Sequence, residues 1–110
     1  MNWVNLKSLE EFDKILQLSQ GLPVLIFKHS TRCSISSMAL SRLEREWESD
    51  YSNPTYLIDL LNHRDLSNHI ASYFKVIHQS PQIIIVKAGN SIYDASHSEI
   101  RFGNFSEFLT

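Results

Sequence analysis

The sequence passes from an apolar run to a helical pattern around its one cysteine, in Leu22-Pro23-Val24-Leu25-Ile26-Phe27-Lys28-His29-Ser30-Thr31-Arg32-Cys33-Ser34-Ile35-Ser36. The residues up to Phe27 are nearly all apolar, which is typical of a β-strand that is covered on both faces. A helical pattern opens at Ser34, so Cys33 is predicted to lie at the first turn of a helix. Unpaired backbone N–H groups and the positive end of the helix dipole lie at that turn. Both favour the thiolate, which is the nucleophilic form of cysteine. Cys33 is therefore the candidate reaction centre.

The composition indicates one ordinary globular domain. The chain has 110 residues, of which 43% are hydrophobic and 20% charged, so we expect a single domain over residues 1–110. A formal net charge of −2 without a basic stripe argues against a nucleic-acid partner. No apolar run reaches the roughly 20 residues that span a membrane. A lone cysteine forms no intrachain disulfide, and the N-terminus lacks a signal-peptide pattern, so we expect a cytoplasmic protein.

Four helices are predicted from the spacing of apolar residues. The first is capped by Ser8, with Glu11 reaching back in a capping box, and stops at Gly21. The second presents an inward stripe of Ile35, Ala39, Leu43 and Trp47. The third is capped by Asp65 and turns inward Leu66, Ile70 and Phe74. The fourth is a short helix over 105–109.

Strand patterns alternate with these helices. Beyond the run that ends at Phe27, strands are predicted at 3–4, 56–59, 82–86 and 91–93, and Ala88-Gly89-Asn90 forms the turn of a final hairpin. The predicted order is β-α-β-α-β-α-β-β-α. This order predicts an α/β fold, a central mixed β-sheet flanked by helices, with right-handed crossovers between parallel neighbours.

This order, with a cysteine after the second strand and a proline before the fourth, resembles the thioredoxin fold over nearly the whole chain. The local signatures are Thr31-Arg32-Cys33-Ser34-Ile35-Ser36, Ser80-Pro81 and the turn Val86-Lys87-Ala88-Gly89-Asn90. Within that superfamily the chain most closely resembles the monothiol bacilliredoxins, or YtxJ-like family. Three features support this narrower match: the Thr-Arg-Cys-x-Ile-Ser signature, the Ser-Pro-Gln start of the fourth strand, and Ala95-Ser96-His97-Ser98-Glu99-Ile100.

The resemblance implies a function and several roles. Family members are associated with bacillithiol, a small thiol, and are thought to remove it from proteins that carry it as a mixed disulfide. It further implies a cis Ser80–Pro81 bond, with Ser80 pairing through its backbone with the bound substrate. The partners would be S-bacillithiolated client proteins, with bacillithiol as a thiol co-substrate and no tightly bound cofactor.

The chain also departs from the thioredoxin pattern. Phe27 stands where thioredoxins keep a buried acid, and Ser36 replaces the second active-site cysteine. Ser34 takes a position where proline is common in relatives. The first two departures argue against a dithiol reductase.

Four side chains are predicted to support Cys33. Ser36 lies one helical turn further on, so its hydroxyl either donates to the thiolate or is satisfied by the first-turn backbone. Lys28 and Arg32 are cations close in sequence, and Arg32 is placed to meet the malate carboxylates of bacillithiol, although an exposed arginine is usually only solvated. His97 lies in the loop after the last strand, where it orients substrate or stabilises a leaving thiolate. The remaining histidines show no metal-ligand spacing, so no metal site is expected.

Two other functions remain open from the sequence. Some monothiol glutaredoxins also have one active cysteine and hold an iron–sulfur cluster between two protomers, although their motif is Cys-Gly-Phe-Ser. A non-catalytic sensing module, in which Cys33 is capped once by a small thiol, is the third possibility.

Overall fold

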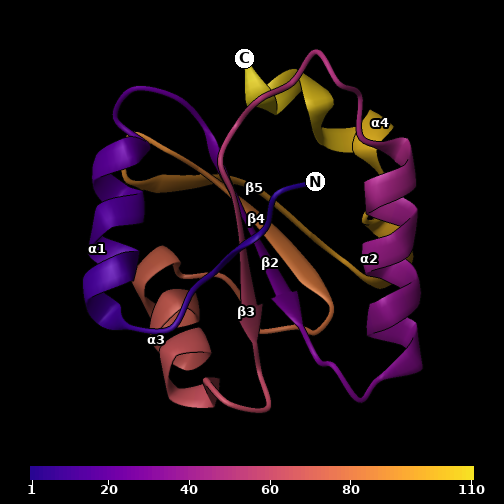
Figure 1. Ribbon diagram of the computed structural model, residues 1–110. Helices are drawn as coiled ribbons and strands as arrows, with labels where there is room; N and C mark the ends of the chain where they lie inside the picture. Colours follow the sequence, from indigo (N-terminus) through magenta and orange to yellow (C-terminus); the bar gives the residue numbers. More distant parts are fainter.

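The computed structural model describes residues 1–110 and has a five-stranded sheet between two layers of helices (Figure 1). The strands are β1 (Val4–Asn5), β2 (Val24–His29), β3 (Thr55–Asp59), β4 (Gln82–Lys87) and β5 (Asn90–Ser96). The helices are α1 (Leu9–Leu18), α2 (Ser34–Glu46), α3 (Arg64–Phe74) and α4 (Phe102–Phe105), with 3₁₀ turns at His97–Glu99 and Ser106–Leu109. The predicted element order and α/β class are confirmed.

The sheet is mixed, with spatial order β1-β3-β2-β4-β5. β3 runs parallel to both β1 and β2, whereas β4 is antiparallel to β2 and β5 is antiparallel to β4. Because β2 and β4 are antiparallel neighbours, with Lys28 opposite Gln82, the last residues of β2 and the first residues of β4 lie at the same end of the sheet. The turn that carries Cys33 and the segment that ends in Pro81 therefore leave adjacent strands side by side.

The central strand β2 is buried along its whole length, as its apolar run predicts. Leu25 and Phe27 join the core beneath α2 and α4, while Val24 and Ile26 join the core beneath α1 and α3. Figure 1 shows these helix pairs on opposite faces of the sheet. No helix is both long and apolar enough to cross a membrane.

The predicted inward stripe of α2 is wrong at its first position. Ile35 is 59% exposed, and the buried residues of this helix are Ser36, Ala39 and Leu43. The helix begins directly after Cys33, and this phase turns Ser36 inward, where two hydrogen bonds satisfy its hydroxyl. Apolarity alone favoured Ile35, because a buried serine with polar partners leaves no hydrophobic signal.

Three predicted helix boundaries also differ. His63 rather than Asp65 precedes α3, so Asp65 lies inside the first turn, where its charge still complements the dipole. α1 ends at Leu18, before Gly21, and the terminal helix begins three residues earlier than predicted. At α1 the Ser8 cap is confirmed, since its side chain accepts from Glu11 N, but Glu11 Oε1 accepts from the Lys7 N–H instead of that of Ser8.

Candidate active site

Cys33 is the N-cap residue of α2 and carries a free, partly exposed thiol. Its N–H donates to Ser30 O at 3.1 Å, which closes the turn after β2, and its carbonyl accepts from Ser37 N at 3.0 Å, which opens the helix. No side-chain hydrogen bond caps this helix end. Cys33 therefore stands at the end of α2 where unpaired first-turn N–H groups collect, although its sulfur accepts no hydrogen bond from them in this structure.

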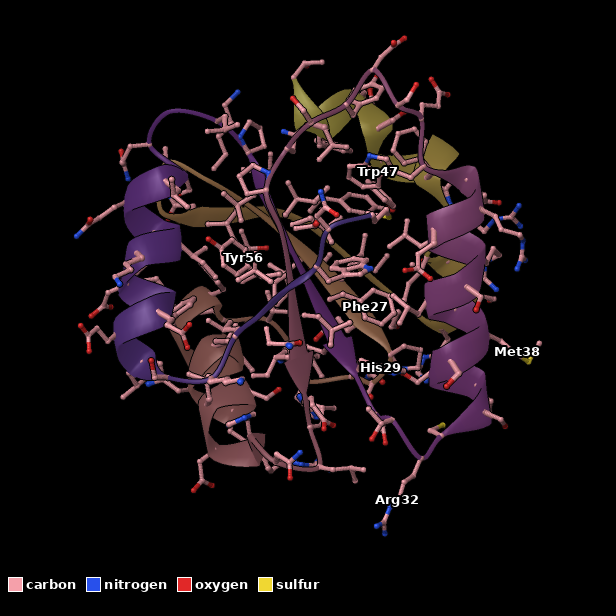
Figure 2. All side chains as sticks on the ribbon, viewed as in Figure 1. Phe27, His29, Arg32, Met38, Trp47 and Tyr56 are labelled. Carbon is pink, nitrogen blue, oxygen red and sulfur yellow. The ribbon has the colours of Figure 1, made fainter.

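His29 and Ser36 form a buried pair next to this turn. His29 Nδ1 lies 2.6 Å from Ser36 Oγ, which also accepts from Ser30 N at 3.1 Å. Burial lowers the pKa of His29, and this effect outweighs the negative charges of Asp59 and Glu44, which raise it. The ring is therefore neutral near pH 7. Figure 2 shows His29 on the face of the sheet that α2 covers.

The hydrogen bonds of Ser36 differ from both predictions. Its hydroxyl is bonded to His29 and to the N–H of Ser30, neither to the Cys33 sulfur nor to the first-turn backbone of α2. Two proton arrangements fit this geometry. If His29 Nδ1 is unprotonated, Ser36 donates its proton to it; if Nδ1 carries the proton, the Ser36 O–H is free to point elsewhere. The tautomer of His29 therefore decides whether Ser36 has a donor to offer.

Ser80, Pro81 and His97 lie close together at the end of the sheet where β4 begins and β5 ends. The Ser80–Pro81 peptide bond is cis. Pro81 O accepts from the N–H of His97 at 3.1 Å. His97 has φ 54, a left-handed conformation that histidine adopts more readily than most residues, and its side chain is exposed. Arg42 of α2 secures the same turn by donating to the carbonyls of His97 and Ile100.

Arg32 stands apart from this arrangement. Its side chain projects from the turn into solvent (Figure 2), and it forms no side-chain hydrogen bond or ion pair. The structure therefore keeps Arg32 next to Cys33 in the chain without directing it to any protein group.

Lys28 was expected near the cysteine, but its amine points to the other side of the sheet. The side chain is completely buried, and Nζ donates to Ser67 O of α3 and to His78 Nδ1, each at 3.2 Å. Burial lowers the pKa of Lys28 to about 8. Sequence reasoning missed this cluster, although the alternation of side chains along β2 places Lys28 on the face opposite Phe27 and His29.

A shallow depression of about 400 Å³ lies on the outer face of α2. It is lined by Ser37, Met38, Ser41, Arg42 and Arg45, and it begins one helical turn after Cys33. No group of three or more His, Cys, Asp or Glu side chains is arranged to hold a metal ion.

Comparison with solved structures shows the same architecture elsewhere. A thioredoxin-fold protein described as a candidate oxidoreductase superposes with a TM-score of 0.83 at 25% identity, over 94% of this chain and 90% of that one. Thioredoxin from Trypanosoma brucei brucei has a TM-score of 0.75 at 15% identity, over 96% and 86% of the two chains. Thioredoxin O2 from Arabidopsis thaliana has a TM-score of 0.75 at 17% identity, over 98% and 95%. The fold and the cysteine at the start of α2 define a thiol oxidoreductase of the thioredoxin class.

A family model assigns the chain more narrowly than its fold does. A family model described as "Monothiol bacilliredoxin BrxC" matches residues 4–105. The chain belongs to the monothiol bacilliredoxin family.

Proposed function

We propose that the protein removes bacillithiol from client proteins that carry it as a mixed disulfide, with Cys33 as the only nucleophile. The observation that carries this proposal is the free, partly exposed thiol of Cys33 at the start of α2, in a chain that has no other cysteine. Family membership supports the choice of bacillithiol.

The reaction has two thiol–disulfide exchanges. The Cys33 thiolate attacks the bacillithiol sulfur of the client's mixed disulfide, the client sulfur leaves as a thiolate and is protonated, and a disulfide forms between Cys33 and bacillithiol. An external thiol, either a second small thiol or another protein, then attacks this disulfide and returns Cys33 to its reduced form. No electrons are gained or lost beyond those exchanged between the thiol and disulfide partners.

Neighbouring groups support the exchange in this proposal. The Ser80 backbone pairs with the extended substrate beside the mixed disulfide, and Pro81 fixes that segment at the start of β4. Ser36, through its contacts with His29 and the Ser30 N–H, holds the turn that carries Cys33. His97 orients substrate or stabilises the leaving thiolate.

The small thiol also needs a place for its charged end. Bacillithiol carries two malate carboxylates, and guanidinium groups bind carboxylates through paired N–H donors. Arg32 is free for this role beside Cys33, and Arg42 and Arg45 line the depression that begins one turn away.

The test uses intact-mass analysis of the reduced protein mixed with a bacillithiolated client. We expect the protein to gain one bacillithiol and the client to return to its free thiol, while a Cys33→Ser variant leaves the client unchanged. A client that keeps its adduct in the presence of wild-type protein would falsify the proposal. An iron–sulfur carrier would instead show visible absorption and a dimer after anaerobic purification, and a sensor would be capped without releasing bacillithiol from other proteins.

A further inference from the structure

Lys28 is a buried amine without an acidic partner. It lies near the end of the central strand β2 with no solvent exposure, and the one ion pair of the protein joins Arg101 and Glu46 elsewhere. Burying an amine removes it from water at a free-energy cost, which an apolar residue at this position would avoid. Lys28 therefore lowers the stability of the fold relative to an apolar residue, and the contacts of its amine indicate its role.

The contacts of Lys28 and of its cross-strand neighbour Gln82 converge on one loop. Lys28 Nζ donates to the side chain of His78 at 3.2 Å. Gln82 is also buried; its Nε2 donates to Ile77 O at 3.0 Å, and its Oε1 accepts from Gln79 N at 3.4 Å. Three consecutive residues, 77–79, are therefore each attached to a polar side chain from the central sheet.

Apolar packing does little to hold this loop. Ile77 is 80% exposed, and no residue between 75 and 80 is buried. The loop joins α3 to β4 and ends in Ser80 and Pro81, and the far side of Pro81 is fixed by the N–H of His97. The polar contacts of Lys28 and Gln82, together with a longer contact of 3.4 Å between Ser67 Oγ and His78 Nδ1, fix the approach to Ser80.

We infer that Lys28 is a positioning residue, which acts with Gln82 to hold the loop 75–80 so that the Ser80 backbone is ready to pair with a client. This inference rests on the proposed function, because the pairing of Ser80 with the client belongs to it. His78 accepts from Lys28 in its neutral form; its pKa is lowered by burial and by the charges of Lys28 and Arg64. Either the ammonium or the neutral amine of Lys28 donates both hydrogen bonds, so the loop stays attached on both sides of the Lys28 titration.

The test compares Lys28→Met with Ile26→Met. Both variants place methionine on β2, on the same face, but Ile26 is an apolar core residue that forms no side-chain hydrogen bond to the loop. For Lys28→Met we expect kcat/KM for release of bacillithiol from a bacillithiolated client to fall at least tenfold, mainly through KM. Alkylation of Cys33 by iodoacetamide, which needs no client pairing, should stay within twofold of wild type, and Ile26→Met should match wild type in both assays.

Amide hydrogen exchange tests the loop without any client. In Lys28→Met the amide of Gln79, the one N–H of residues 77–80 that donates a hydrogen bond, should exchange at least tenfold faster, with no change in Ile26→Met. His78→Ala should reproduce the effect if Lys28→Met does not fold. Unchanged loop exchange overturns the inference, as does faster loop exchange with wild-type kinetics toward the client. If wild-type protein releases no bacillithiol, the proposed function fails, and loop exchange still decides whether Lys28 holds the loop.

Discussion

Ser36 shows how one small polar side chain connects the nucleophile's helix to the central strand. It has no solvent exposure and joins His29 to the N–H of Ser30. A serine that packs inward at the third residue of a helix is unusual, because serine has a modest helix propensity and needs a partner when buried. Its position therefore depends on His29, and the two residues act as a unit.

Ser36→Ala should remove that unit. The variant leaves the buried His29 ring nitrogen and the partly buried Ser30 N–H without partners, so the free energy of unfolding should fall by about 1–3 kcal/mol in urea denaturation. If Ser36 also donates to the sulfur, alkylation of Cys33 by iodoacetamide should change in the same variant. The control is Ser37→Ala on the exposed face of α2, which should stay within about 0.5 kcal/mol of wild type. Equal stabilities of the two variants would contradict the role of the buried pair.

Lys28 gives a prediction about pH. Its pKa falls from 10.5 to about 8 on folding, so the unfolded chain binds more protons than the folded protein between these two values. Stability should therefore rise with pH across that window, and at pH 7 the full penalty of about 3 kcal/mol applies. Relative to Lys28→Met, which has no such titration, wild type should gain about that much from pH 7.5 to 10.5. Parallel stability curves from denaturation at each pH would refute the assignment.

At the scale of secondary-structure elements, the side chain of Arg42 connects α2 by hydrogen bonds to the 3₁₀ turn at His97–Glu99 and to the residue after it. Arg42 Nε and Nη2 donate to Ile100 O at 3.3 and 3.2 Å, and Nη2 also donates to His97 O at 3.1 Å. The same turn holds Pro81 through the N–H of His97. Arg42 thus links the helix that carries Cys33 to the segment that carries Pro81.

Arg42→Met should loosen this link. The variant keeps the apolar stem but removes the donors to Ile100 O and one of the two donors to His97 O, which still accepts from Ile100 N, so we expect a loss of about 1 kcal/mol in unfolding free energy. The His97 amide should exchange faster with solvent in the same variant. Arg45→Met, on the same helix and without a hydrogen-bonding partner, is the matched control and should stay within about 0.5 kcal/mol. A loss of the same size in both variants would show that charge, not the link, is responsible.

The elements also show what sequence can and cannot predict here. The apolar run of β2 and the break at Cys33 predicted the central strand and the start of α2, because burial on both faces leaves a continuous hydrophobic signal. The same signal hides Lys28: a polar residue at the end of such a run reads as the first residue of a turn. The side chain of Ser36 points inward and that of Ile35 points outward because α2 begins directly after Cys33. A start one residue earlier or later would change which side chains face the core. His78 is 50 positions from its partner Lys28, so no local sequence pattern indicates this contact. Gln82 is only 5 positions from its partner Ile77.

For the protein as a unit, the single cysteine sets a limit on turnover. The chain has only Cys33, so after one exchange no internal thiol is available to release the bound bacillithiol. Without added thiol, release of client thiol should stop at one equivalent per protein chain, and the protein should carry one bacillithiol by intact mass. Added bacillithiol should then restore turnover, because it attacks the disulfide at Cys33 and leaves as the bacillithiol disulfide. Several equivalents released in the absence of any added thiol would mean that Cys33 is regenerated by a route the chain itself does not contain, and the monothiol mechanism would have to be abandoned.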